Sequence, residues 1–219
     1  MASRSSKRPV VVVGGGGHAL SLIDALRVGN EKVIGILDAE KNKDFEVLGV
    51  PVLGDDRILV SFDRSEIFVV IGLGISRGLH YRQALGRDLQ NKGFSIRGVI
   101  HPSATIGSGV SISHTAQILT GSIIQPAVTI EDGVVINTGC RVDHNSLIRE
   151  HSFISPGATI CGDVSVGREV LIGAGAVIAP GVNIGDGARV GAGAVVIRDI
   201  SAGQTVVGNP GRPLHTEGE

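Results

Sequence analysis

His144 is the residue whose type and position point most directly to chemistry. It follows Val142 and Asp143, and Gly162 stands eighteen residues further along the chain. A neutral imidazole can remove the proton of an attacking amine or hydroxyl group, which is the step that acyl transfer to such an acceptor requires. A backbone N–H that no side chain shields can stabilise the oxyanion formed by that attack. Whether His144 and Gly162 can act together depends on the elements that carry them.

A repeat of six residues supplies those elements. Every sixth position from Ile100 to Val196 holds Ile or Val, and the position four residues further in each hexad is mostly small. A period of six would scatter these residues over three faces of an α-helix, whereas short strands joined by glycine corners place them all inside a three-sided coil. Three hexads close one coil, and neighbouring coils stack about 4.8 Å apart. His144 then lies at a corner, with Gly162 stacked directly on it.

This repeat resembles that of the hexapeptide-repeat acyltransferases, and the resemblance covers residues 100–200 in one register. It implies a left-handed parallel β-helix, a homotrimer and acetyl-CoA as the acyl donor. Some proteins with this repeat bind zinc or serve as scaffolds instead. A zinc hydratase is disfavoured, because His114 and His144 are thirty residues apart and therefore fall on different edges of the prism.

The first half of the chain begins with a different pattern. An apolar run at Val10–Val13 is followed by a glycine turn and then by a helical pattern over residues 19–26. This order is typical of phosphate sites, because glycine lets the backbone approach an anion and the helix presents free N–H groups. A tight turn that binds nothing would use the same residue types. The turn residues that we predict to contact the substrate are Gly15, Gly16, Gly17 and His18.

The rest of this half predicts a small α/β domain. Strands are predicted over residues 32–37 and 67–71, and a second helix over residues 77–92. The first of these strands ends at Asp38, where an acid can contact a nucleotide, and the second ends at Gly72. We therefore expect a Rossmann-like domain of β-α-β-β-α order. At about 95 residues it is shorter than a full dinucleotide-binding fold, which favours a mononucleotide or a nucleotide sugar.

A glycine-rich nucleotide domain fused to a hexapeptide β-helix resembles the sialic acid O-acetyltransferase family, which includes N-acetyltransferases of nucleotide-linked 4-amino-4,6-dideoxysugars. The motifs that carry the resemblance are the glycine turn at residues 14–19 and the stretches 136–138 and 142–144. The resemblance implies that His144 is the general base, Gly162 the oxyanion donor and Asn137 a polar contact near the sugar or a bound water.

The sequence departs from this family at two positions. Family members commonly carry an acidic residue directly after the histidine to orient it, whereas here the residue after it is Asn145 and the acid, Asp143, comes before. A second family histidine falls at Phe153, and His151 lies two residues earlier. What orients His144 is therefore left open, and His151 is given no role.

The resemblance also implies where the acyl donor binds. In such trimers CoA lies in the groove between neighbouring prisms, against backbone amides that correspond here to Gly173, Ala174, Gly191 and Ala192. Arg212, in the segment after the last coil, is similar to a basic residue that can meet a CoA phosphate. The same glycines could also serve only as corners of the coil.

The composition excludes several other classes of protein. Lys and Arg number 20 against 21 Asp and Glu, for a net charge of −1, and aromatic residues make up 3% of the chain. Such a chain lacks both a basic surface for nucleic acid and aromatic platforms for single-stranded bases. No apolar stretch is long enough to span a membrane, and the two cysteines form no Cys-x-x-Cys pair. We expect a cytoplasmic protein with no metal and no membrane insertion.

Three segments are predicted: a Rossmann-like domain that binds a nucleotide sugar at residues 1–98, an acetyltransferase β-helix at 99–200 and a tail at 201–219. The predicted reaction is N-acetylation by acetyl-CoA of the 4-amino group of a nucleotide-linked 4-amino-4,6-dideoxysugar. GDP-perosamine or a UDP- or dTDP-linked equivalent would fit, for the synthesis of a bacterial surface polysaccharide such as O-antigen. Sialic acid O-acetylation and a catalytically silent scaffold are the alternatives.

Overall fold

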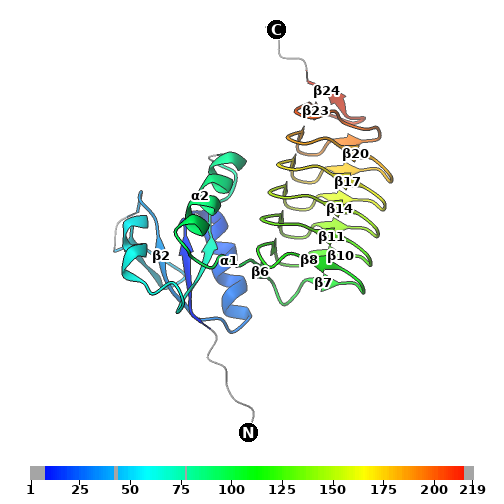
Figure 1. The fold of residues 1–219 in the computed structure, drawn as a ribbon. Coiled ribbons are helices and arrows are strands. Elements are labelled where there is room, and N and C mark those ends of the chain that lie inside the picture. Colours follow the sequence, from blue (N-terminus) through cyan, green and yellow to red (C-terminus); the bar gives the residue numbers. More distant parts are fainter. Residues whose placement is uncertain (1–7, 42–43, 77, 215–219) are drawn as a thin grey trace. The chain divides into compact units, whose positions relative to one another are not determined.

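The computed structural model describes residues 8–41, 44–76 and 78–214. The chain divides into two compact units, Met1–Pro102 and Ser103–Glu219. The first contains all the helices of the described residues, and the second is built from short strands (Figure 1).

The first unit is a five-stranded sheet with helices, and it contains the three strands and the two helices that the first half of the sequence predicts. Strand β1 (Val10–Val13) lies between β2 (Val33–Leu37) and β5 (Phe68–Ile71), and pairs in parallel with both. All four valines of β1 are buried, as is typical of a parallel strand that is covered on both faces. The helices are α1 (Gly17–Val28) and α2 (Leu79–Asn91). With β3 (Glu46–Val47) and β4 (Val50–Gly54), the sheet order is β3-β4-β2-β1-β5.

Three elements of this unit were not predicted from the sequence. They are β3 (Glu46–Val47), β4 (Val50–Gly54) and the 3-10 helix η1 (Asp56–Ser61). β3 and β4 form a hairpin whose two turn residues, Leu48 and Gly49, have φ angles of 50° and 66°. Positive φ at both central residues matches the twist of the flanking strands, and the glycine was the signal for this turn in the sequence. The predicted start of α2 at residue 77 lies outside the described residues.

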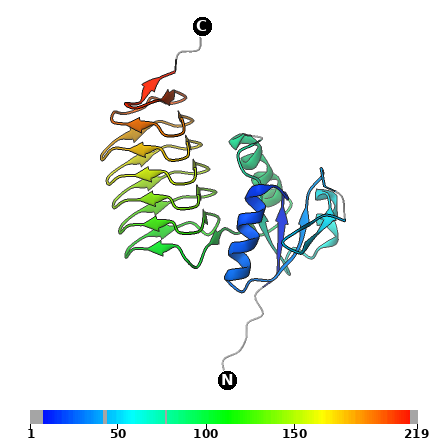
Figure 2. The ribbon, with the colours of Figure 1, turned by 180° about the vertical axis from the view of Figure 1, so that it is seen from behind.

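Together with β6 (Val99–Ile100) from the end of the first unit, the second unit forms a left-handed parallel β-helix, whose stacked coils are seen from two sides in Figures 1 and 2. The pairing of Val142 with Ile160 confirms the coil of eighteen residues. The two-residue strands of the coils are β6 (Val99–Ile100), β7 (Thr105–Ile106), β8 (Ser111–Ile112), β9 (Gln117–Ile118), β10 (Ile123–Ile124), β11 (Thr129–Ile130), β12 (Val135–Ile136), β13 (Arg141–Val142), β14 (Leu147–Ile148), β15 (Phe153–Ile154), β16 (Thr159–Ile160), β17 (Ser165–Val166), β18 (Leu171–Ile172), β19 (Val177–Ile178), β20 (Asn183–Ile184), β21 (Arg189–Val190) and β22 (Val195–Val196).

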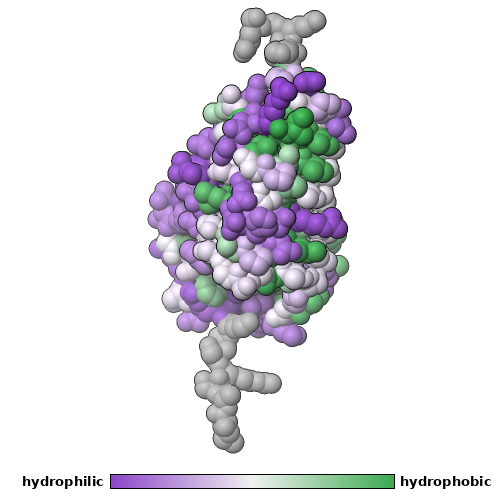
Figure 3. Space-filling model, turned by 90° about the vertical axis from the view of Figure 1, so that its right-hand side faces the viewer, coloured by the Kyte–Doolittle hydropathy of each residue, from purple (hydrophilic) through white to green (hydrophobic). Residues whose placement is uncertain are grey.

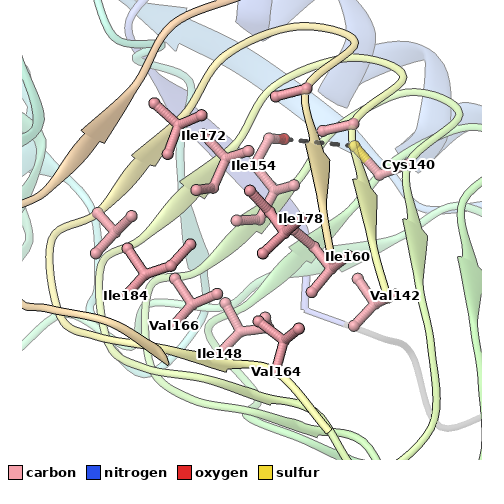
Figure 4. Packing of buried hydrophobic residues seen from close by; sticks show 14 of the residues in the cluster. Cys140, Val142, Ile148, Ile154, Ile160, Val164, Val166, Ile172, Ile178 and Ile184 are labelled. Atoms are coloured by element: carbon pink, nitrogen blue, oxygen red, sulfur yellow. Dashed lines mark hydrogen bonds between the residues drawn. The ribbon is translucent and has the colours of Figure 1, made fainter. Parts of the chain in front are cut away.

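The interior of the β-helix is aliphatic. The inward Ile and Val residues of successive coils lie over one another, as Ile172 lies over Ile154 and Ile178 over Ile160, and all four are fully buried (Figure 4). Cys140 fills one of the small inward positions. Its Sγ donates to the carbonyl oxygens of Ser155 at 3.0 Å and Ile154 at 3.6 Å, the second of which is the dashed line in Figure 4. Burial of each Ile or Val side chain stabilises the fold by about 1.5–3 kcal/mol, so this column of side chains holds the coils together.

The register changes in the last coil, where the sequence predicts one unbroken repeat. Ile200 pairs with Ile184, sixteen residues away, and β23 (Thr205–Val207) is displaced from β21 by the same number. Ile200 packs in the aliphatic core, at 4% exposure. Strands also continue beyond residue 200, where we expected a tail, and β24 (Arg212–Pro213) returns antiparallel to β23.

Over the described ranges, no helix combines the length and the apolar character needed to cross a lipid bilayer.

Candidate active site

The corners of the β-helix are two-residue turns that stack in three columns. We call the column of residues 126, 144, 162 and 180 the His144 edge, and the column of residues 138, 156, 174 and 192 the Ala174 edge. Backbone hydrogen bonds join successive turns in each column, such as Asp163 N to His144 O at 2.9 Å and Gly193 N to Ala174 O at 2.8 Å. The third column contains Asp132, Glu150 and Arg168.

His144 and Gly162 meet on the His144 edge, as the eighteen-residue coil predicts. The imidazole lies against the glycine backbone: a methyl group built on Gly162 would be 2.5 Å from Cε1 and 2.7 Å from Nε2 of the ring. The His144 side chain is 53% exposed and is open to a substrate. Across the part of the chain that the structure describes, the Gly162 N–H finds no acceptor. An imidazole nitrogen and an unpaired amide therefore lie side by side.

The polar groups around the ring differ from those that the sequence indicated. Asp143 accepts a hydrogen bond from the backbone N–H of His144 at 2.9 Å, so its carboxylate caps the turn. Asn145 Nδ2 lies 3.3 Å from Nδ1 of His144 and donates to Asp163 Oδ1 at 3.1 Å. Asp163 Oδ2 is 3.9 Å from the same Nδ1. Asp163 was not singled out from the sequence, although it stands one coil after Asn145.

A groove begins beside His144, on the outer face of β10, β13 and β16. Its volume is about 320 Å³. Asp143 and Cys161, the residues directly before His144 and Gly162, lie on its wall, and the remaining lining residues are Ile123, Gln125, Arg141, Val142, Thr159 and Ile160. Burial and the neighbouring Asp143 raise the pKa of the Cys161 thiol, so this cysteine is a poor nucleophile. The groove is a surface along which a substrate can approach the imidazole.

The residues predicted to bind the acyl donor gather on the Ala174 edge, away from His144. The amides of Gly173 and Gly191 donate within the sheet, to Val190 O and Val206 O at 2.8 Å each. The backbone N–H groups of Ala174 and Ala192 have no hydrogen-bond acceptor among the described residues. Of the four predicted donor-binding amides, these two are therefore open to a ligand.

Asn137 and Arg212 also belong with the Ala174 edge. Asn137 directly precedes Thr138, and its Oδ1 accepts from the Thr138 N–H at 2.8 Å. Arg212 is exposed, and its strand partner is Val207. Val207 lies next to Gly191, since its Cγ1 would be 2.8 Å from a methyl group built on that glycine. The prediction that Asn137 joins His144 is therefore not met within one chain, because their turns belong to different columns.

In the first unit, Asp38 holds the glycine turn. Its Oδ2 accepts from the Gly15 N–H at 2.7 Å, and its Oδ1 accepts from the Glu40 N–H at 2.8 Å. Gly16 and Gly17 at the start of α1 have open space around them, since nothing lies within 4 Å of a methyl group built on either. These two glycines are accessible to an anion at the helix N-terminus.

Gly72 and His18 are further residues that the sequence predicts to contact the substrate. A methyl group on Gly72 would lie 2.7 Å from Val12 Cγ1 and even closer to the Gly14 carbonyl oxygen, so Gly72 allows close packing of β5 against the turn. His18 is half-buried, and its Cβ would be 3.4 Å from a methyl group on Gly74. Neither residue lines the pocket beside the turn.

That pocket has a volume of about 150 Å³ and lies at the carboxyl ends of β1, β2 and β5. Gly16, Asp38, Asp56 and Tyr81 are among its lining residues. Burial raises the pKa of the Asp56 carboxyl. Since the pocket presents acidic side chains, it suits the hydroxyl and N–H donors of a nucleoside better than a phosphate, which the open amides at Gly16 and Gly17 suit.

Among the described residues, no three His, Cys, Asp or Glu side chains converge as metal ligands would. His114 and Thr115 form one turn, and the next turn of the same column is Asp132–Gly133, because Gly133 N donates to Thr115 Oγ1. His114 therefore lies in the third column, on a different edge from His144.

Comparison with known proteins covers both units. Residues 9–78 match the PglD N-terminal domain, and residues 145–180 and 163–198 match the bacterial transferase hexapeptide (six repeats). The acetyltransferase domain of PglB from Neisseria gonorrhoeae FA1090 is 30% identical, with a TM-score of 0.89 over 95% of this chain and 100% of that chain. PerB from Caulobacter crescentus, solved with CoA and GDP-perosamine, is 38% identical, with a TM-score of 0.87 over 94% of this chain and 97% of that chain.

The curated relatives match less than half of the chain. Serine acetyltransferase from Salmonella typhimurium is 35% identical over 97 residues, which are 42% of this chain and 36% of that protein. The chain thus spans about a third of the length of the curated relatives that it matches. The similarity to the PglB domain and to PerB extends over nearly the whole of each chain, and this chain therefore belongs to the nucleotide-sugar acetyltransferase family of hexapeptide-repeat proteins.

Proposed function

We propose that this protein transfers the acetyl group of acetyl-CoA to the 4-amino group of a nucleotide-linked 4-amino-4,6-dideoxysugar. The observation that carries the proposal is the packing of the His144 ring against Gly162, whose amide is unpaired in the described chain. The related PglB domain has been solved with acetyl coenzyme A, and PerB with CoA and GDP-perosamine. These complexes support the class of donor and the class of acceptor.

His144 and Gly162 act together as the amine attacks. As the uncharged amine attacks the thioester carbonyl, a C–N bond forms and Nε2 of His144 takes a proton from the amine nitrogen. The oxyanion that develops on the carbonyl oxygen accepts a hydrogen bond from the Gly162 N–H. The C–S bond then breaks, and CoA leaves as a thiol once the proton held by His144 reaches its sulfur. A general base contributes about 10²- to 10⁴-fold to the rate, and one oxyanion donor about 10²- to 10³-fold.

The separation of the two edges supports a site made by two chains of a homotrimer. The base lies on the His144 edge, whereas the open amides of Ala174 and Ala192, with Asn137 and Arg212, lie on the Ala174 edge. In a closed ring of three prisms, each chain presents one surface to one neighbour and a different surface to the other, and we infer that the His144 edge of one chain faces the Ala174 edge of the next. Figure 3 shows apolar side chains reaching the surface of one side of the molecule in patches among polar ones, as a contact surface requires.

The first unit binds the nucleotide in this proposal. Its pocket takes the nucleoside, and the amides at Gly16 and Gly17 take a phosphate group. Nothing in the lining decides between guanine, uracil and thymine, so all three nucleotides belong in the test.

The proposal is tested by measuring free CoA thiol released from acetyl-CoA with GDP-, UDP- and dTDP-linked 4-amino-4,6-dideoxysugars, and with sialic acid as the competing acceptor. We expect release with at least one amino sugar and a loss of about 10²- to 10⁴-fold in kcat for His144→Ala, because the general base is removed. Faster turnover of sialic acid would favour O-acetylation, and no release with any acceptor would favour a scaffold.

A further inference from the structure

Asp163 is the carboxylate closest to the imidazole of His144, and it comes from the neighbouring coil. Its Oδ2 lies 3.9 Å from Nδ1 of the ring. The turn that carries it stacks on the turn of Asn145, and the two residues have φ angles of 59° and 56°. Asn and Asp adopt this left-handed conformation more readily than other residues with a Cβ, so the two side chains project from equivalent positions of successive coils.

Asn145 stands between the ring and the carboxylate, in a fixed orientation. Its Nδ2 donates to Asp163 Oδ1 at 3.1 Å and lies 3.3 Å from His144 Nδ1. Exchanging the amide nitrogen and oxygen would set two acceptor oxygens against each other, so Asp163 keeps the nitrogen turned toward the ring. An amide nitrogen donates and does not accept, so this contact suits a lone pair on Nδ1, and Asn145 cannot hold a proton that sits there. When Nδ1 carries the hydrogen, the ring must therefore turn away from the Asn145 amide.

This arrangement matters because the two ring nitrogens of a neutral imidazole have opposite roles. For Nε2 to take a proton, it must carry the lone pair, and the ring hydrogen must then be on Nδ1. That hydrogen needs an acceptor. Asp143 caps the backbone N–H of His144, so the remaining carboxylate beside the ring is that of Asp163. A charge-assisted hydrogen bond requires a separation of about 2.8 Å, so the two atoms must approach by about 1 Å.

The ring is free to make that movement. The side chains of His144 and Asp163 are 53% and 61% exposed, so neither is held by packing on all sides. Under the ring lies Gly162, which has no side chain to block rotation about the Cα–Cβ and Cβ–Cγ bonds of His144.

We propose that Asp163 is the positioning residue of His144: it accepts the Nδ1 hydrogen and thereby leaves Nε2 unprotonated toward the acceptor. Asn145 holds the carboxylate in place. When Nε2 takes the proton of the amine, the imidazolium charge faces Asp163, which itself stays unprotonated. The acid that family members commonly place after the histidine has here moved to the next coil, at the position stacked on Asn145. This inference rests on the proposed function for the role of Nε2.

The test compares Asp163→Asn, Asn145→Asp and the double variant Asn145→Asp/Asp163→Asn. We expect Asp163→Asn to lower kcat for thiol release by about 10- to 100-fold, the usual effect of removing the partner of a functional histidine, while the KM for acetyl-CoA stays within about twofold. The double variant returns a carboxylate to the ring from position 145 and should recover at least a third of the parental kcat. Glu169→Gln, which changes an acid at the corresponding turn position of the next corner, is the matched control and should leave kcat unchanged.

A second measurement does not depend on turnover. The nitrogen-15 chemical shifts of the His144 ring, assigned by comparison with His144→Ala, report which nitrogen carries the hydrogen. We expect the Nδ1–H tautomer in the parent and a shift toward Nε2–H in Asp163→Asn, whether or not the acceptor tested is the right one. The Nε2–H tautomer in the parent, or a double variant no more active than Asp163→Asn, would overturn the role of Asp163. In either case, the loss of activity in His144→Ala would leave the proposed function standing.

Discussion

The imidazole of His144 rests on the α-carbon of Gly162, at a distance that leaves no room for a side chain between them. A methyl group on Gly162 would be 2.5 Å from Cε1 of the ring. Many corner glycines of this β-helix have positive φ with open space around them, such as Gly139 at 67° and Gly157 at 70°, and they are glycine for conformational reasons. Gly162 is not among the residues with positive φ. It is glycine because of the histidine that covers it.

Gly162→Ala should therefore damage catalysis more than stability. The methyl group displaces the ring by about 1 Å, and a displacement of that size in a reacting group can reduce a rate by about 10²-fold. We expect kcat to fall by about 10- to 100-fold, while the thermal midpoint changes by no more than a few degrees. Pro180→Ala, one coil further along the same edge, is the control, with kcat within about twofold of the parent. A Gly162→Ala enzyme as active as this control would mean that the ring does not work from its position over Gly162.

The β-helix and the meeting of His144 with Gly162 could be predicted because both follow from one period. A strict spacing of six fixes the coil, and the coil places residues 144 and 162 in one column. The same arithmetic separates Asn137 from His144, since their turns are six residues apart and lie on neighbouring corners. The family motif suggested one shared site, and within a single chain the geometry keeps these two residues apart.

The roles of Asp163 and Gly72 depend on side-chain contacts that a pattern in a single sequence does not predict. Asp163 matters because an asparagine replaced the usual acid one coil earlier, and the compensation is visible only once the side chains are placed. Gly72 stands where a substrate contact is reasonable, but its neighbours are Val12 and the Gly14 carbonyl. The register change at Ile200 is a pairing across sixteen residues in place of eighteen, and the repeat of six predicts only the latter.

Asp38→Ala should weaken nucleotide-sugar binding through the glycine turn. The carboxylate accepts from the Gly15 and Glu40 amides at 2.7 and 2.8 Å, and hydrogen bonds to a charged group contribute about 1.5–3 kcal/mol. We expect the KM for the acceptor to rise by about tenfold or more, with little change in the KM for acetyl-CoA, in the thiol-release assay. Asp24→Asn, an exposed acid on α1, is the matched control. Equal acceptor KM values for the two variants would remove the glycine turn from the acceptor site.

Mixed trimers test whether two chains form one site. We expect His144→Ala and Ala192→Glu each to be nearly inactive alone, the first for lack of a base and the second because a carboxylate repels the phosphates of CoA at the Ala174 edge. In trimers assembled at random from equal amounts of the two, about one site in four joins an intact His144 edge to an intact Ala174 edge. Co-expression followed by thiol-release measurements should then give about a quarter of the parental activity. No recovery in verified mixed trimers would place both halves of the site in one chain.

Cys140 should make the protein less stable at alkaline pH. Burial raises the pKa of its thiol to about 11, whereas an exposed cysteine ionises near about 8.5. Between these values the unfolded chain loses a proton that the folded chain keeps, so the stabilisation is fully present below about pH 8.5 and is lost as pH rises toward about 11. The loss should approach about 3 kcal/mol, since one pKa unit corresponds to about 1.4 kcal/mol. Urea unfolding at fixed protein concentration from pH 8 to 11 measures this loss of unfolding free energy, and Cys140→Ala should show a flatter profile.

A thiol reagent applied at pH 8 should modify the half-buried Cys161 well before Cys140, because the inward Cys140 is both enclosed and protonated. Equal rates for the two cysteines would mean that the coils open readily around Cys140.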